Sequence, residues 1–200
     1  TLDEQGKKHL KFRFRGPDIQ DKSIFGQRDE YFISFWTDDY KLHLGDRIYS
    51  LSPLTENYLY GRGLEASLNI DDNLTVGAYH LGTRWLKPGI YETASYIDYS
   101  FNDSYQLGLN YLRKTENAES TDIISFEGQL KPFEDTELEL EYALGPGHSK
   151  DDNAYLTRLY GRASLLTYYL KLIRAGPDYP GYYTNLDYVS AGVAVPIDKH

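Results

Sequence analysis

The segment GLEASLNIDDNLTVGAYHL, residues 63–81, decides how this chain folds. Apolar and polar residues alternate on both sides of Asp71-Asp72-Asn73, which predicts two strands joined by a tight turn. The first strand would carry Leu64, Ala66, Leu68 and Ile70 on one face, and Gly63, Glu65, Ser67 and Asn69 on the other. The segment therefore predicts an antiparallel hairpin with one apolar and one polar face.

Connections between such strands switch strictly between short and long along the chain. The short ones are Asp71-Asp72-Asn73, Asn102-Asp103-Ser104, Glu134-Asp135 and Ser164-Leu165, and the long ones are residues 82–90, 114–121, 145–154 and 176–185. A soluble β-sandwich has no reason to keep its long loops at one end. A transmembrane β-barrel returns its strands through tight turns at one end and longer loops at the other. The alternation therefore predicts a barrel of the bacterial outer membrane.

Alternation divides the whole chain into candidate strands. They span residues 8–15, 29–37, 40–48, 58–70, 74–81, 91–101, 105–113, 122–131, 136–144, 155–164, 166–174 and 186–195. We expect an all-β fold over residues 1–200, a single antiparallel up-and-down transmembrane β-barrel domain of about 12 strands, or part of a larger barrel.

The composition is compatible with a barrel. There is no run of about 20 apolar residues, which a helical span needs, and the mean hydropathy of −0.58 is mild because a barrel strand shows lipid only every second side chain. The chain has 20 Tyr. Tyr is typical of the aromatic belts at membrane interfaces, although β-sheets in general favour it as well.

Several functions are disfavoured by the sequence. A net charge of −9 argues against a nucleic-acid partner, since phosphate binding needs clustered Lys and Arg. The chain has no Cys, and its five His are scattered, so we expect no metal and no cofactor. No G-x-S-x-G nucleophile motif is present. We therefore expect a protein that is not an enzyme.

Alternation sorts the strands into two faces. The residues expected to face lipid include Leu64, Leu68, Leu107, Leu109, Leu138, Leu140, Leu170 and Val193. The residues expected to line a pore are Glu65, Asp98, Glu127, Glu137, Glu139 and Glu141, with Arg158, Arg162 and Lys171 as a basic stripe. An acidic lining favours cations. The alternative is the solvated face of a soluble sheet, where these charges form weak cross-strand pairs.

Aromatic residues gather in the long loops. Trp85 lies in one, and Tyr179, Tyr182 and Tyr183 lie in another that also contains Pro177 and Pro180. Such side chains on constrained loops can stack on sugars or contact a partner, or they can simply cover the rim of the barrel.

The stretch from Gly45-Asp46 through Ser50–Leu54 to Tyr60-Gly61-Arg62-Gly63 opens a long alternating strand. With it, the chain resembles bacterial outer-membrane β-barrels, of the usher-like or porin-like export kind. The resemblance implies an outer-membrane pore or a secretion and translocation channel, without enzymatic activity. It implies outer-membrane lipid and a transported solute, polymer or protein as partners. The chain lacks a recognisable plug and a terminal aromatic residue, and we therefore expect a fragment or an unusually closed barrel.

One alternative function remains open at this stage. The same alternation fits a soluble, Tyr-rich antiparallel β-sheet module that binds carbohydrate or a cell-surface partner. Extraction only in detergent and heat-modifiable migration would separate the barrel from this module.

Overall fold

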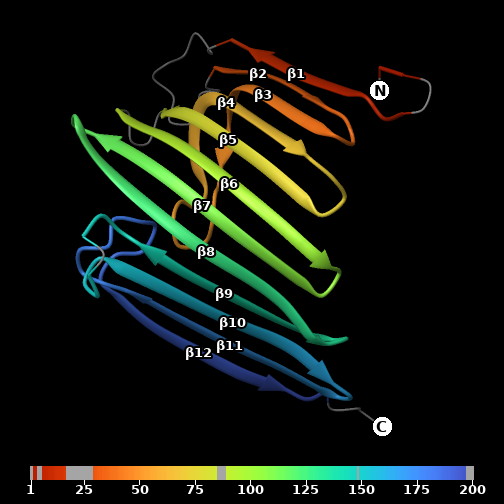
Figure 1. The fold of residues 1–200 in the computed structure, drawn as a ribbon, viewed down its shortest axis with the longest axis vertical. Helices are drawn as coiled ribbons and strands as arrows, with labels where there is room; N and C mark the ends of the chain where they lie inside the picture. The colour runs from red at the N-terminus through yellow and green to blue at the C-terminus, as the bar shows by residue number, and fades with distance from the viewer. Residues whose placement is uncertain (1, 4–5, 17–28, 85–88, 148, 197–200) are drawn as a thin grey trace.

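The computed structural model describes residues 2–3, 6–16, 29–84, 89–147 and 149–196. Within these residues, twelve strands form one sheet in which each strand pairs antiparallel with its neighbours in sequence (Figure 1). The fold is all-β and up-and-down, as the alternation predicts. The described part of the chain contains no helix long and apolar enough to cross a membrane.

The strands are 7 to 15 residues long. They are β1 (His9–Arg15), β2 (Glu30–Trp36), β3 (Tyr40–Tyr49), β4 (Leu59–Asn69), β5 (Leu74–Thr83), β6 (Ile90–Asn102), β7 (Tyr105–Glu116), β8 (Glu119–Phe133), β9 (Thr136–Leu144), β10 (Asn153–Ala163), β11 (Leu166–Ala175) and β12 (Leu186–Ala194).

Tight turns and longer connections lie at opposite ends of the sheet (Figure 1). Among the longer ones are residues 50–58, 145–152 and 176–185, at the end that the sequence predicts for them. The connection between β5 and β6 lies at the same end and includes residues 85–88, which fall outside the described residues.

The long loop predicted at residues 114–121 is wrong. Strands β7 and β8 continue through it and meet in a two-residue turn at Asn117 and Ala118, whose φ angles are 52° and 68°. Two successive left-handed residues make the type I′ turn that matches the twist of a hairpin. Asn-Ala lacks the glycine by which such turns are recognised in a sequence, and the polar residues around it resemble a loop.

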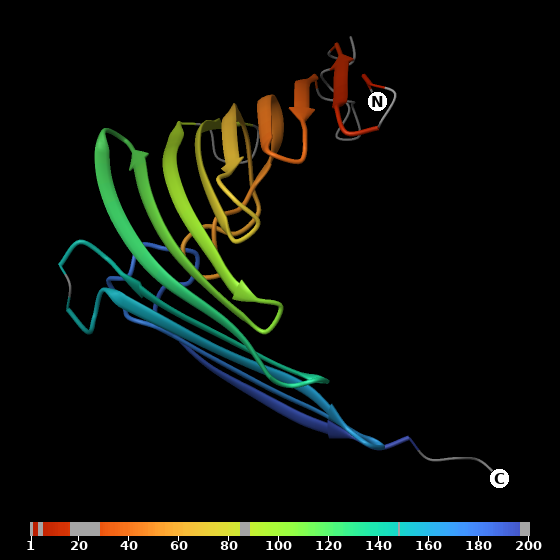
Figure 2. The ribbon, with the colours of Figure 1, turned by 45° about the vertical axis from the view of Figure 1, so that its right-hand side comes forward.

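The sheet is curved and open. In the described residues, β1 pairs only with β2 and β12 only with β11. Figure 2 shows the strands following an arc, with the connection between β3 and β4 inside the curve. We call the side of the sheet that this connection covers the inner face and the opposite side the outer face.

The strand register fixes which side chains share the outer face. Leu64 pairs with Leu44 on β3 and with His80 on β5, and the same row of outward positions runs on through every strand pair. The residues predicted to face lipid all lie on this face: Leu64, Leu68, Leu107, Leu109, Leu138, Leu140, Leu170 and Val193. Large apolar side chains here are exposed, Leu107 by 52% and Val193 by 67%.

Tyrosines border this apolar band at both ends of the outer face. Near the long-loop end they are Tyr31, Tyr60, Tyr91, Tyr111, Tyr142 and Tyr155, and near the short-turn end Tyr40, Tyr99, Tyr105 and Tyr168. Two aromatic belts that flank an apolar band are typical of a barrel wall, because the ring prefers the apolar side of an interface and the hydroxyl the wet side.

A charge introduced into the apolar band tests which face meets lipid. We expect Leu109→Arg to lower the free energy of unfolding in lipid by roughly 2–4 kcal/mol, the cost of a cationic side chain near the bilayer midplane. The inner-face variant Gln106→Arg on the same strand serves as the control and should change it by less than about 1 kcal/mol. Urea unfolding in vesicles measures both. Equal costs at the two positions would contradict the assignment of faces.

Candidate functional site

The inner face is crossed by a segment that lies between the predicted strands at residues 40–48 and 58–70. Residues 51–57, between β3 and β4, fold back over the sheet, and we call them the strap. The strap is closed on itself by a bridge between Ser52 and Glu56, and the amide of Leu51 donates to the carbonyl of Glu56 at 2.9 Å. The hydroxyl of Ser52 also accepts from the amide of Thr55 at 3.1 Å. These local bonds give the strap its own compact turn.

Glu141 on β9 anchors the strap to the wall. Its carboxylate accepts from the Ser52 hydroxyl at 2.5 Å and from the Leu54 amide at 3.0 Å. The Ser52 hydroxyl also lies 3.5 Å from that of Ser125 on β8. Glu141 is only 3% exposed. A carboxylate removed from water in this way needs such donors, because burying it without hydrogen bonds would be costly.

The connection between β11 and β12, residues 176–185, packs against the strap. The Tyr179 hydroxyl donates to the carbonyl of Leu54 at 3.1 Å, and the Tyr182 amide donates to the same oxygen at 2.9 Å. Leu54 and Tyr179 are fully buried and pack in one apolar cluster with Leu156 of β10. Burial raises the pKa of the Tyr179 phenol above its ordinary value. The phenol therefore keeps its proton and remains a donor to the strap.

Lys114 on β7 holds the other end of the strap. Its ammonium lies 3.2 Å from the Glu56 carboxylate and 3.7 Å from that of Glu92, a fully buried residue of β6. One cation thus lies between a carboxylate of the strap and one of the wall. The single cation offsets part of the cost of removing the two carboxylates from water.

All nine residues predicted to line a pore lie on the inner face by strand register. Most carboxylates are already engaged: Glu65 with Arg47 and Lys41, Glu127 with Asn110, Glu139 with Arg158, and Glu141 with the strap. Glu137 and Arg162 are exposed, while Asp98 and Lys171 are half-buried. Their role as a pore lining stays a prediction.

Charges on the inner face are segregated by strand. Basic side chains predominate on β1 to β3, with Lys11, Arg13, Arg15, Lys41 and Arg47. Acidic ones predominate on β6 to β9, with Glu92, Asp98, Glu127, Glu137, Glu139 and Glu141, and Arg158, Arg162 and Lys171 follow on β10 and β11. The inner face therefore carries an acidic stripe between two basic ones.

Sequence reasoning missed several inner-face residues. Lys41 and Arg47 were within reach, because they alternate with the outward Leu42, Leu44 and Ile48 on β3. Ser52 and Lys114 were not, since their partners lie on distant strands and the sequence carries no signal for those contacts.

The aromatic residues predicted in the long loops differ in how far they are exposed. Tyr179 is buried inside the fold, while Tyr182 is 47% exposed and its ring meets that of half-buried Tyr183 edge-on, with centroids 4.9 Å apart. Trp85 lies outside the described residues. A contact of Tyr182 or Tyr183 with a partner stays a prediction.

The chain is similar in structure to bacterial porins. It superimposes on a mutant form of the Rhodopseudomonas blastica porin with a TM-score of 0.59 and 16% identity, over 82% of this chain and 54% of the porin. It superimposes on OccK11 (OpdR) of Pseudomonas aeruginosa with a TM-score of 0.58 and 14% identity, over 82% of this chain and 51% of the other. No protein-family model and no curated protein matches the sequence.

These similarities establish the fold class, an antiparallel up-and-down sheet of the kind that forms porin barrels. The chain spans about half the length of the porins it matches. The matches support the porin-like part of the expected resemblance, and neither of these two structures supports the usher-like part.

A cysteine pair tests where the strap lies. The chain has no Cys, and the hydroxyls of Ser52 and Ser125 are 3.5 Å apart, so we expect Ser52→Cys with Ser125→Cys to form a disulfide after small side-chain rotations. The control pairs Ser52→Cys with Ser95→Cys, which lies on the outer face of β6 and should not cross-link. Electrophoresis with and without reductant reads the result. A strap that projects away from the wall would give no bond in either pair.

Removal of the anchor tests what holds the strap. Glu141→Ala leaves the Ser52 hydroxyl and the Leu54 amide without their acceptor, which we expect to cost about 1–3 kcal/mol. Hydrogen exchange at the Leu54 amide should quicken accordingly. Glu137→Ala, on the same strand face but exposed, should leave that amide protected. Unchanged exchange in Glu141→Ala would show that the strap is held by other contacts.

Proposed function

We propose that this chain forms the wall of a pore in the bacterial outer membrane, through which small hydrophilic solutes diffuse, and that the strap narrows the pore. One observation carries the proposal. The curved sheet has an apolar outer face between two belts of Tyr, and a charged inner face that the strap crosses. The porin-like fold supports the same assignment.

The outer face favours a membrane over water. A half-buried soluble sheet covers its apolar face with a second layer of structure. In the described residues nothing covers the outer face, and Leu64, Phe126 and Val189 are more than half exposed. Lipid removes this surface from water, so the soluble carbohydrate-binding module is the weaker candidate.

The open edges bear on how the pore closes. Strands β1 and β12 each present one row of backbone groups without a ladder partner among the described residues. In hydrocarbon each unsatisfied group costs several kcal/mol, and spanning sheets are therefore closed. We propose that further strands pair with β1 and β12 in the membrane. The porins of similar fold, of which the match covers only 54% and 51%, support this closure.

The strap also limits the kind of molecule that could pass through the proposed pore. Its bonds to β7, β8 and β9, together with the cover from residues 176–185, place a fixed obstacle in the curve of the sheet. A folded protein needs a wide, clear passage, whereas a small polar solute passes beside such an obstacle. This favours a solute pore over a secretion channel, with outer-membrane lipid and solutes as the partners and no chemical reaction assigned.

Ion selectivity in planar bilayers tests the pore. We expect a modest preference for cations, because the acidic stripe is offset by the basic side chains beside it. Glu137→Gln with Glu139→Gln should reduce the preference, and added salt should weaken it by screening. Asp103→Asn, an exposed charge in the short turn after β6, is the matched control and should leave it unchanged. Anion selectivity, or the absence of conductance, would contradict the proposal.

A further inference from the structure

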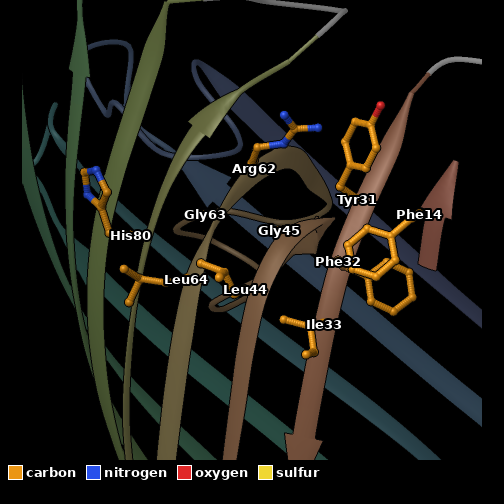
Figure 3. A pocket seen from close by; sticks show the side chains of 10 residues that line it. All are labelled: Phe14, Tyr31, Phe32, Ile33, Leu44, Gly45, Arg62, Gly63, Leu64 and His80. Carbon is orange, nitrogen blue, oxygen red and sulfur yellow. The ribbon is translucent and has the colours of Figure 1, made fainter. Parts of the chain in front are cut away.

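A groove on the outer face, over β1 to β5 near their long-loop end, has the shape and chemistry of a lipid site. Its volume is about 470 Å³, within the range of pockets that hold small molecules. One part is apolar, lined by Phe14, Ile33, Leu44 and Leu64. Figure 3 shows Arg62 and Tyr31 together at the opposite end of the groove. A groove with one apolar and one polar end matches an amphiphile.

Two glycines form the floor between these ends. Gly45 and Gly63 pair across β3 and β4, and both line the groove. A Cβ on Gly45 would lie 2.1 Å from the carbonyl oxygen of Tyr31, and one on Gly63 would lie 2.1 Å from that of His80. Neither position can carry a side chain. Both glycines belong to the inner-face row of the register, so only their backbone reaches the groove, and its floor is bare backbone.

The polar end holds Arg62 in one orientation. The buried Asp46 carboxylate accepts from Nε of Arg62 at 2.9 Å and from Nη2 at 2.6 Å, and it also accepts from Arg84 at 3.0 Å. Asp29 accepts from Nη2 of Arg62 at 3.2 Å. Two aspartates and two arginines balance in charge, so the network can lie close to lipid without a net charge.

Two donors remain for a ligand at this end. In the described residues the Nη1 group of Arg62 and the hydroxyl of Tyr31 make none of these bonds, and the guanidinium lies over the Tyr31 ring, 5.1 Å from its centroid. The Arg62 side chain is 42% exposed. A guanidinium oriented by carboxylates and beside a phenol is suited to bind phosphate oxygens.

We propose that this groove binds one phospholipid of the surrounding membrane, with an acyl chain along Leu44 and Leu64 and its phosphate at Arg62 and Tyr31. The inference rests on the outer face meeting lipid, as the proposed function requires, but it does not need the pore to conduct. Burial of apolar surface binds the acyl chain of the lipid. The donors of Arg62 and Tyr31 select a phosphorylated headgroup over an uncharged one.

Native mass spectrometry after mild detergent extraction tests the site. The probe is the full chain reconstituted in vesicles of phosphatidylethanolamine and phosphatidylglycerol. We expect one phospholipid retained per chain. Arg62→Gln and Tyr31→Phe, which remove donors, and Leu64→Trp, which fills the groove, should each lower the retained fraction, for Arg62→Gln roughly tenfold, as expected for one lost charge-assisted hydrogen bond.

Matched variants elsewhere on the outer face serve as controls. Leu107→Trp adds the same bulk outside the groove, and Arg174→Gln removes another outward Arg paired with an aspartate, Asp187. Both should retain the lipid. Heat-modifiable migration checks that every variant is folded.

No lipid retained by the folded wild-type chain would overturn the inference, as would equal retention by Leu64→Trp and Leu107→Trp. Retention of a long-chain fatty acid as strongly as phospholipid would overturn the role of the phosphate. Displacement of the lipid by inorganic phosphate alone would overturn the role of the apolar part of the groove. Conductance measured on the same samples separates the two proposals. A conducting protein without bound lipid refutes only the site, and a silent protein with bound lipid refutes only the pore.

Discussion

The ladder of backbone hydrogen bonds between consecutive strands is the constraint on which the other features depend. Each strand pairs with the next one in sequence, so a side chain's face is fixed by whether its position is odd or even within the strand. A slip of one residue in any pair would exchange Leu107 with Gln106, and the apolar band with the charged wall. The two faces, the Tyr belts and the groove all follow from keeping this register.

The carboxylates on the inner face mainly stabilise the fold, and most of them contribute little to the electrostatic potential over that face. Glu141 and Glu56 are nearly buried and hold the strap, while Glu65 and Glu139 are paired with cations of neighbouring strands. A paired carboxylate contributes less to the potential over this face than a free one, because its partner cancels most of the field at a distance. The side chains that remain to act on the proposed passage of ions are mainly the exposed ones, such as Glu137 and Arg162.

Local patterns predicted the fold, and long-range contacts account for what they missed. Alternation gave the strands and the faces of Leu64 and Glu65, because period two is a property of neighbouring residues. It failed at Asn117-Ala118, where a hairpin turn has the composition of a loop. It could not predict the strap, since the bond between Ser52 and Glu141 joins residues 89 apart and nothing near Ser52 encodes its partner. The groove was hidden likewise, because Arg62 and Asp29 meet only after β2 and β4 are in place.

The strap braces the curved sheet from its inner face. It leaves the sheet between β3 and β4 and is hydrogen-bonded to β9, so it spans the strands between them. If the sheet flattened, those strands would move apart at the long-loop end, and the ties at Glu141 and Lys114 would break first. The curvature of the sheet is therefore braced within this chain, by the contacts of the strap with β7, β8 and β9. The proposed closing strands would meet a sheet whose curvature is already supported.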